Sequence, residues 1–360
     1  MIVLLLTTLL VSLSSEFIVD SQTNIRYLRK FDNSLQAKYL AKTGMKIAEM
    51  ILKADKSGVT PTMLTGKKTS KNIDSYNDIW ALNFPEIETD VGTLKLQISD
   101  EQSKINISSL ANDFSDPTKY YRIAQQFFLN MGLSMDFTDV IVDWVDIDDS
   151  RFSYGAESDY YTGLTPPYSA KNAPMDSINE LLMVKGITPE IYYGLGGGNF
   201  GREENLVEHN RGDNKIDLSN IEGILLGLDK SEEEKELRKI GKEKSRKLSD
   251  YLRVNGHRDF TNYQNRININ TASYRIISAL TEKMTDDIVT EIINKRIDQP
   301  FNSVSEISKY IDDPDLRNKY LTVKSSIFKI VSTGKVKETT VKIVTIYNRD
   351  YRRYYYWSEE

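Results

Sequence analysis

The sequence predicts an α+β protein in which a long N-terminal helix packs on an antiparallel sheet and a large all-α region is inserted in that sheet. Three observations support this prediction. Residues 17–54 contain no proline and a single glycine, and their apolar residues recur at helical spacing. Apolar and polar residues alternate over residues 93–107 and again over 327–346. The residues between these two stretches follow mainly helical patterns.

Composition limits the kinds of chemistry that the chain can perform. A chain of 360 residues is long enough for more than one compact core, and its net charge of −5 gives no general attraction to nucleic acid or anionic membranes. The absence of cysteine excludes a disulfide framework, a thiolate nucleophile and a cysteine-based zinc site. The only two histidines, His209 and His257, lie in polar surroundings, which argues against a Ser-His-Asp triad. Carboxylates and backbone oxygens remain as the plausible chemistry.

The first element is predicted to be one long helix over residues 1–55, apolar at its start and amphipathic afterwards. The opening run MIVLLLTTLLVSLSS is shorter than the ~20 apolar residues that span a bilayer as a helix. It also lacks the basic start and small-residue cleavage site of a signal peptide. The apolar positions that then follow helical spacing are Ile18, Ile25, Leu28, Leu35, Tyr39, Leu40, Ile47, Met50 and Ile51. The alternative is a cleaved signal followed by a separate helix.

The next elements divide the remaining chain into three predicted parts. Residues 56–110 begin with a polar linker and then alternate, with Leu94, Leu96 and Ile98 on one face and Ile105 and Ile107 after them. Residues 111–322 form the inserted helical domain. Residues 323–360 return to alternation, and we expect two strands that are joined around Gly334 as a hairpin.

Several helices are predicted inside the inserted domain. The helical stretches are residues 121–133, 137–145, 176–187, 188–195 and 231–254, and two further helices fall within 266–307. The helix from Ser231 begins with a capping box completed by Glu234. Gly196–Gly201 formally satisfies the dinucleotide pattern G-x-G-x-x-G but has no strand before it and no helix after it, so we interpret it as a loop.

An acidic stretch, VDWVDIDDSRFSYGAESDYYTG, is the candidate functional site. Its carboxylates are Asp143, Asp146, Asp148, Asp149, Glu157 and Asp159, with Arg151 as the single cation among them. Repulsion between charges this close requires compensation if the loop is ordered. Calcium takes 6–8 oxygen ligands, and Gly155 would let the chain fold back to bring Glu157 and Asp159 opposite the earlier acids. The sequence therefore predicts a calcium site, although the spacing is not that of an EF-hand.

Two other interpretations of the acidic stretch remain open. It could be a solvated acidic loop with Trp144, Tyr160 and Tyr161 packed beneath it. A pair of catalytic carboxylates is the third interpretation, but no carbohydrate-binding aromatic cleft is evident in the sequence.

Five sequence motifs, taken in their order along the chain, resemble those of the minor pseudopilin K family of type II secretion systems. The motifs are ISDEQSKINIS, VDWVDIDD, AESDYY, PPYSAKNAPMDSINELLMVKGITPEIYYGL and ININTASYRIISAL, and the similarity runs from the N-terminal helix to the C-terminal hairpin. The resemblance implies a pilin-like fold with a helical domain inserted in the sheet, and calcium bound in that domain. It also implies a single-pass inner-membrane protein whose bulk lies in the periplasm. Its expected role is to cap the tip of the pseudopilus and help to initiate it, together with minor pseudopilins I and J.

The start of the chain departs from the family pattern. Members of the family are made with a leader that prepilin peptidase removes after a glycine, whereas Met1 here already lies inside the apolar helix. We expect either that the true start is upstream or that Met1 is a processed or misassigned start. No acidic residue precedes Glu16, and in the family the lack of an early acid fits a tip subunit, which has no neighbour above it.

A DNA-binding protein of competence type is the alternative function. Residues 183–189 and the ININTA segment resemble helix-hairpin-helix units, which bind phosphates through glycine N–H groups at a helix N-terminus. The first hairpin has Thr188 in place of the second glycine, and the second carries Asp286 and Asp287 where phosphate would approach. We therefore interpret both as protein-packing units and expect no nucleic acid. A free-standing secreted calcium module is a further alternative.

Two surfaces are expected to contact partners. We place the main assembly contact on the amphipathic part of the helix, from Ile25 to Ile51. The C-terminal YRRYYYW is either a partner surface or an additional edge strand, and the sequence leaves both open.

Overall fold

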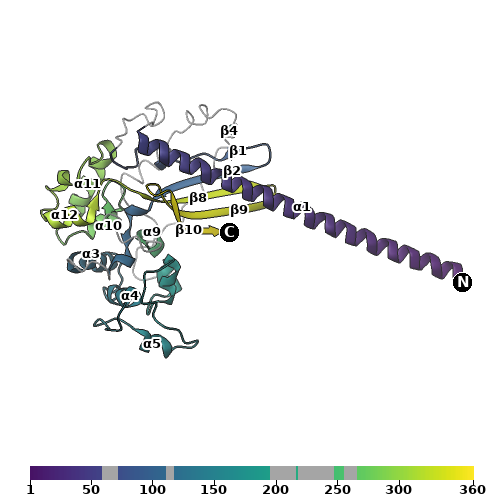
Figure 1. The fold of residues 1–360 in the computed structure, drawn as a ribbon, viewed down its shortest axis with the longest axis horizontal. Helices are drawn as coiled ribbons and strands as arrows, with labels where there is room; N and C mark the ends of the chain where they lie inside the picture. Colours follow the sequence, from purple (N-terminus) through teal and green to yellow (C-terminus); the bar gives the residue numbers. More distant parts are fainter. Residues whose placement is uncertain (59–71, 111–116, 195–215, 218–246, 255–265) are drawn as a thin grey trace.

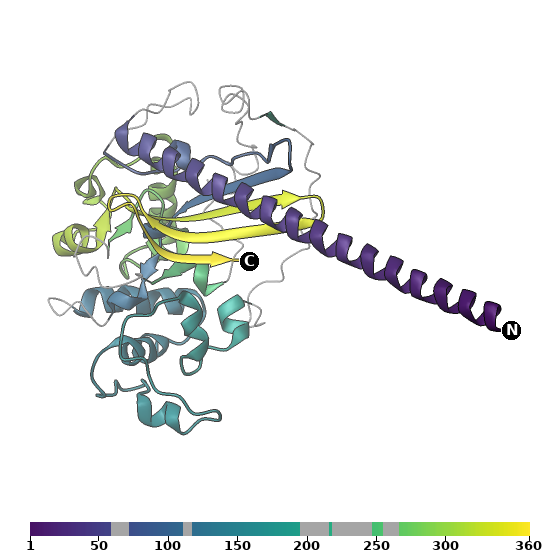
Figure 2. The ribbon, with the colours of Figure 1, turned by 45° about the vertical axis from the view of Figure 1, so that its right-hand side comes forward.

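A computed structural model shows a long helix, a sheet and a helical unit, and it describes residues 1–58, 72–110, 117–194, 216–217, 247–254 and 266–360 (Figures 1 and 2). Helix α1 runs without a break from Ile2 to Ser57, which confirms the prediction of one long helix. It ends at Gly58, where the left-handed conformation (φ 69°) directs the N–H back to the last helical carbonyls. Its N-terminal half projects away from the rest of the molecule (Figure 2). Gly196–Gly201, both histidines and residues 231–246 lie outside the described residues.

The sheet has six strands in the order β10-β9-β8-β2-β1-β4. Their bounds are β1 Ile87–Glu88, β2 Thr93–Asp100, β4 Ile216–Asp217, β8 Ile327–Val336, β9 Thr339–Asn348 and β10 Arg353–Glu359. Neighbouring strands are antiparallel except β1 and β4. Strand β2 pairs with β8 along its whole length, with Leu96 opposite Ser332. The two strand segments that the sequence separates are therefore neighbours in one sheet.

The C-terminal hairpin is confirmed, but its turn is not where the sequence predicted it. Strands β8 and β9 are joined by Lys337 and Glu338, and Lys337 has a positive φ of 52°, which suits a two-residue hairpin turn. Gly334, the predicted turn residue, lies within β8 instead. A Cβ atom at Gly334 would lie 2.2 Å from the backbone oxygen of Ala37. The glycine is there because α1 crosses the strand at that point.

Helix α1 packs on the sheet through small residues. Ala37, Ala41 and Ala48 are completely buried, whereas Tyr39 and Met50, two of the residues from which the helix was predicted, are each 61% exposed. The close contact with the sheet is therefore made by small residues, and only some of the apolar positions from which the helix was predicted, such as Leu40, are buried there. The physical reason is the short distance between helix and strands, since the hydroxyl of Ser332 donates to the backbone oxygen of Ala41 at 2.7 Å.

The helical unit is inserted between β2 and β8 (Figure 1). Its α-helices are α3 Pro117–Asn130, α4 Phe137–Val145, α5 Ser158–Thr162, α6 Pro189–Tyr193, α9 Leu248–Tyr251, α10 Tyr274–Ser278, α11 Asp286–Asp298 and α12 Pro314–Tyr320. It has its own hydrophobic core, separate from the core between α1 and the sheet. Ile105, Ile107 and Leu110 belong to the core of the helical unit, so the packing favours a boundary closer to Asp100 than to residue 110.

Two short parallel strand pairs lie outside the main sheet. Strand β3 (Ile105–Asn106) pairs with β5 (Leu252–Arg253), and β6 (Ile267–Asn268) pairs with β7 (Leu321–Thr322). Within the described part of the helix predicted over residues 231–254, Leu248–Tyr251 is helical, whereas Leu252 and Arg253 form β5, so the prediction is wrong for these two residues. Leu252 is buried, and here the backbone pairs with β3 in the core instead of forming further helical hydrogen bonds.

A buried polar network joins the helical unit to the sheet. Asp100, at the end of β2, accepts hydrogen bonds from the hydroxyls of Thr271 and Ser325, both at 2.6 Å, and from the Asn268 amide at 3.2 Å. The ININTA and ISDEQ motifs are therefore in contact where the helical unit joins the sheet. Because every donor is buried with its acceptor, the network holds the insertion in one orientation.

The C-terminal tail forms β10, an additional edge strand paired with β9. The Tyr354 ring packs against Tyr347 and Trp357, with centroids 5.1 and 5.3 Å away. Its hydroxyl contacts the Glu49 carboxylate of α1. The tail thus covers part of α1, while Trp357 remains 41% exposed.

Candidate metal centre

The acidic loop follows α4, which has a strongly apolar buried side. Val140, Ile141 and Trp144 pack into the core of the helical unit. Asp139 and Asp143 are four residues apart and so lie on one face of the helix. Both are buried. The acidic loop folds back onto α4 at this face, where Tyr154 N donates to Asp139 at 3.1 Å. Asp139 was missed by the sequence reasoning, although its spacing from Asp143 was a usable signal.

Asp143 is the centre of the loop. Its carboxylate is fully buried and accepts hydrogen bonds from the backbone N–H of Phe152 at 3.1 and 3.3 Å. A Cβ atom at Gly155 would lie 1.8 Å from one oxygen of this carboxylate. The glycine therefore lets the chain fold back closely, as the sequence predicted, and brings Glu157 to the same place.

Three carboxylates converge in the folded loop. One oxygen from each of Asp143, Asp146 and Glu157 lies within 4.8 Å of the others. Glu157 is only 3% exposed, yet neither of its carboxylate oxygens has a hydrogen-bond partner among the described residues, and Oδ1 of Asp146 also has none. A buried carboxylate without a partner is costly. The site is therefore short of positive charge or of hydrogen-bond donors.

The electrostatics of the loop agree with this geometry. Burial, followed by repulsion from neighbouring acids, raises the pKa of Glu157 from 4.5 to about 7 and that of Asp146 from 3.8 to about 7. Burial also raises the pKa of Asp143, although backbone N–H groups oppose the shift. A bound cation would reverse these shifts because it stabilises the charged forms.

The other three predicted ligands have partners of their own. Asp148 accepts from Ser150 N at 2.8 Å, Asp149 from the Asn172 amide at 3.1 Å, and Asp159 from the backbone N–H of Tyr160 at 2.8 Å. The charges of Asp148 and Asp149 still act on the central group and raise the pKa of Asp146. The structure therefore gathers three of the six acids, and ligation by any of the six remains a prediction.

The central group fits a hard divalent cation. Three carboxylates offer up to six oxygens, and calcium takes 6–8 from side chains, backbone and water at about 2.3–2.6 Å. Lys185 donates to the backbone oxygen of Gly155 at 3.1 Å rather than to a carboxylate of the group. The residues present thus suit the predicted ion, with Asp143, Asp146 and Glu157 as its candidate ligands.

Without a divalent cation, the free energy of unfolding is expected to fall as pH rises from about 4.5 to about 7. In this window the folded Glu157 and Asp146 keep protons that the unfolded chain has released, so each proton contributes a slope of up to about 1.4 kcal/mol per pH unit. Calcium should remove this slope. Thermal unfolding with EDTA or calcium at several pH values checks the prediction. Glu157→Gln should lessen the slope and the calcium effect, whereas the exposed Glu282→Gln should not; equal behaviour of the two variants would contradict it.

The helix-hairpin-helix-like segments carry a different charge from phosphate-binding hairpins. In the first, Gly186 has a positive φ of 80°, and Thr188 caps the short helix α6. In the second, Asp286 and Asp287 form the first turn of α11, and Asp286 accepts from the hydroxyl of Tyr274 at 2.5 Å. Carboxylates at this helix N-terminus oppose the approach of phosphate, so the geometry does not favour the DNA-binding alternative.

The fold is of the pilin-like class, because the C-terminal part of one long helix packs on a mainly antiparallel sheet and the N-terminal part is exposed. Two family models, both described as type II secretion system (T2SS), protein K, match residues 103–196 and 267–324. The first match contains the acidic loop, and the second contains the ININTA segment. Over these two stretches the chain matches the type II secretion system protein K family.

Known relatives agree with this assignment. The chain is 29% identical to the putative type II secretion system protein K of Escherichia coli K12 over 203 residues, which are 54% of this chain and 59% of the relative. It is 28% identical to protein K of Aeromonas hydrophila over 206 residues, covering 53% and 59% respectively. The matches thus span somewhat more than half of the length of either relative.

A solved structure is similar in fold over almost the whole chain. It is a chain from the crystal structure of the GspK-GspI-GspJ complex of the enterotoxigenic Escherichia coli type 2 secretion system. The similarity has a TM-score of 0.60 and covers 94% of this chain and 99% of the other, at 14% sequence identity. At this identity the comparison establishes the fold alone.

Proposed function

We propose that the protein is a non-enzymatic minor pseudopilin that caps the tip of the type II secretion pseudopilus and helps to initiate it, for export of folded proteins across the outer membrane. The observation that carries this proposal is the division of α1. No side chain before Ala37 is buried, whereas the helix from there to Asp55 packs on the sheet. The part of α1 that does not pack on the sheet is therefore available to a membrane and to neighbouring subunits.

The start of α1 is the proposed inner-membrane anchor. Within α1, an 18-residue window is apolar enough to cross a membrane, and none of it is buried in the rest of the molecule. At 1.5 Å per residue such a window covers about 27 Å, close to the ~30 Å of a bilayer core. The remainder of the chain would then lie in the periplasm.

The middle of α1 is the proposed assembly surface. Ile25, Leu28, Leu35 and Tyr39 are between 40% and 68% exposed. At 100° per residue these positions fall on one side of the helix, opposite the small residues that meet the sheet. We therefore propose that, within the predicted contact region of residues 25–51, partners bind this exposed side of the helix.

The tip position is supported by the place of the helical unit. It departs from the sheet at β2, returns at β8, and lies to one side of the sheet away from the free half of α1 (Figures 1 and 2). A helical unit of this breadth would prevent another subunit from adding at the tip of the pseudopilus. The exposed part of α1 would still offer a surface to the subunits beneath it. The partners we propose are minor pseudopilins I and J, because the similar structure was solved in a complex named for those subunits.

Co-purification of the full chain with pseudopilins I and J in detergent and calcium tests the proposal. The wild-type protein is expected to elute with both. Leu28→Asp places a charge on the exposed apolar side of the helix and should reduce co-elution. The expected loss of apparent affinity is at least tenfold, about 1.4 kcal/mol. Lys30→Ser, on the opposite side of the helix, is the matched control. Failure of the wild-type proteins to co-elute would overturn the proposed partnership.

A further inference from the structure

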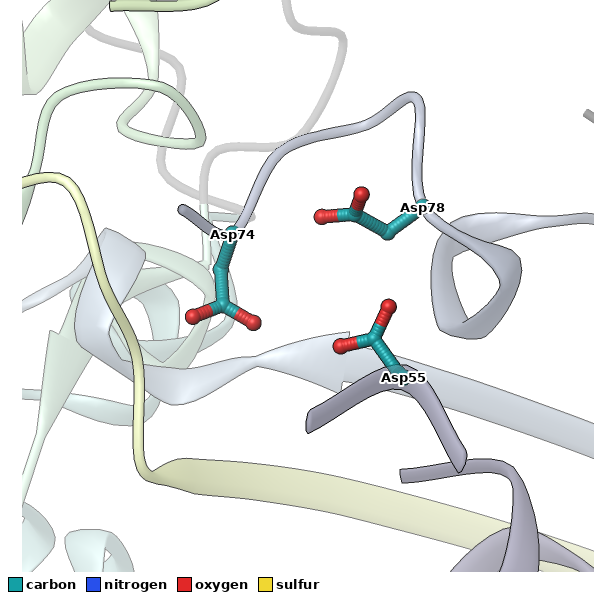
Figure 3. A group of neighbouring side chains, drawn as sticks. All are labelled: Asp55, Asp74 and Asp78. Atoms are coloured by element: carbon teal, nitrogen blue, oxygen red, sulfur yellow. The ribbon is translucent and has the colours of Figure 1, made fainter. Parts of the chain in front are cut away.

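A second group of acids, separate from that of the acidic loop, lies where α1 ends beside the sheet (Figure 3). Asp55 is in the last turn of α1, Asp74 precedes the 3₁₀ helix η1 (Ile79–Ala81), and Asp78 immediately precedes that helix at its N-cap position. The three side chains are 8%, 1% and 1% exposed. One carboxylate oxygen of each lies within 4.8 Å of the others, and Figure 3 shows the three carboxylates directed toward a common space.

The group carries more negative charge than its described surroundings neutralise. Arg349 donates to Oδ2 of Asp55 at 2.9 Å and to Oδ2 of Asp74 at 2.6 Å. The other described contacts are backbone N–H groups, from Ser325 to Asp74 at 2.8 Å and from Ser75 to Asp78 at 2.6 Å. Three carboxylates therefore share one guanidinium among the residues that the structure describes.

One oxygen of the group lacks a hydrogen-bond donor within the described part of the chain. Asp74 Oδ2 accepts from both Arg349 and Ser325, whereas Asp74 Oδ1 is buried and accepts from nothing among the described residues. The cost of such an orphaned carboxylate oxygen is large in the interior. Asp100 provides a contrast, because its buried carboxylate accepts from Ser325, Thr271 and the Gln102 backbone.

The electrostatics point the same way. Burial, followed by the charge of Asp55, raises the pKa of Asp78 to about 8, and burial raises that of Asp74 to about 6 although Arg349 opposes the shift. Burial also raises the pKa of Asp55 despite its contact with Arg349. At neutral pH the fully charged group is therefore unstable unless a further positive charge joins it.

We propose that Asp55, Asp74 and Asp78 bind one divalent cation of the hard, oxygen-preferring class, such as Ca²⁺ or Mg²⁺, at a site separate from the acidic loop. Two positive charges together with Arg349 balance the three carboxylates. The free oxygens of the aspartates and water would supply the ligands, as these ions require. The ion would tie the end of the assembly helix to η1 and, through Arg349, to the turn after β9. This site goes beyond the proposed function and does not depend on it.

Ion stoichiometry of the full chain in detergent tests the proposal. After removal of metal with a chelator, Ca²⁺, Mg²⁺ and Mn²⁺ are titrated by calorimetry into the wild-type protein, Asp78→Asn and the exposed control Asp90→Asn. Asp78→Asn is expected to bind one ion fewer per chain, and Asp90→Asn the same number as the wild type. The loss should recur in a Glu157→Gln background, which separates this site from the acidic loop.

The fold of the variant is checked in the same samples. The amide that replaces the carboxylate in Asp78→Asn keeps an oxygen that can accept from Ser75 N and removes the buried charge. Metal-free Asp78→Asn is therefore expected to melt no lower than the metal-free wild type. Calcium should raise its melting temperature less than it raises that of Asp90→Asn. If Asp78→Asn is folded and binds as many ions of every kind as the wild type, the proposed site is overturned.

Discussion

Replacing Arg349 with methionine is expected to lower the free energy of unfolding by about 3–5 kcal/mol at neutral pH in EDTA, as in other proteins that lose one partner of a buried ion pair. The substitution leaves Asp55 and Asp74, which are 8% and 1% exposed, without the cation that contacts both. It also removes the guanidinium from its position 4.9 Å over the Phe328 ring. Denaturant unfolding followed by tryptophan fluorescence measures the effect.

Two comparisons separate charge from packing. Arg353→Met removes an exposed arginine of β10 and should change stability by no more than about 0.5 kcal/mol. The penalty for Arg349→Met should shrink toward pH 5, because protonated aspartates no longer need the cation. Addition of Asp55→Asn to Arg349→Met should recover part of the loss. A penalty that is independent of pH and of Asp55 would contradict the electrostatic explanation.

Substitution of Gly334 by alanine is expected to destabilise the packing of α1 on the sheet by about 1–3 kcal/mol or more, the usual range for overpacking. The added Cβ would lie 2.2 Å from Ala37 O and 2.8 Å from Ala41 N. Both are backbone atoms, so no side chain can rotate away and the helix itself must move. Thermal unfolding and limited proteolysis of α1 measure the change.

Gly163→Ala is the matched control for this substitution. A Cβ there would meet its nearest neighbour, Tyr160 O, at 3.4 Å, and Gly163 has an ordinary negative φ of −78°. The control should therefore leave both the melting temperature and the proteolysis of α1 nearly unchanged. Equal effects of the two substitutions would show that close approach of α1 is not the reason for Gly334.

The acidic loop illustrates how far sequence reasoning reaches into a site. A dense run of carboxylates with a glycine in its middle predicted that the chain folds back on itself, and the contact of Gly155 with Asp143 agrees with this. The selection of Asp143, Asp146 and Glu157 from the six acids depends on burial and on backbone partners such as Phe152. Those quantities have no local signature, and ion binding itself stays a prediction.

The group of Asp55, Asp74 and Asp78 was not predicted at all. Asp74 and Asp78 are four residues apart, but Asp55 lies in α1, and Arg349 follows almost three hundred residues after Asp55. Only the docking of α1 against the sheet brings them together. The contact between Asp100 and Thr271 likewise depends on tertiary structure, because their hydrogen bond joins two motifs that are far apart in the chain.

The sequence by itself determined the elements whose signal is local: the unbroken α1, the antiparallel hairpin of β8 and β9, and the placement of a helical unit between β2 and β8. Periodicity of 3.6 or 2 residues carries such information because each side chain's face follows from its neighbours in the chain. Tertiary structure alone decided which side of α1 meets the sheet, where the hairpin turns, and which carboxylates share a buried space. These depend on how closely backbones approach and on which charges lose water, which are properties of distant residues brought into contact.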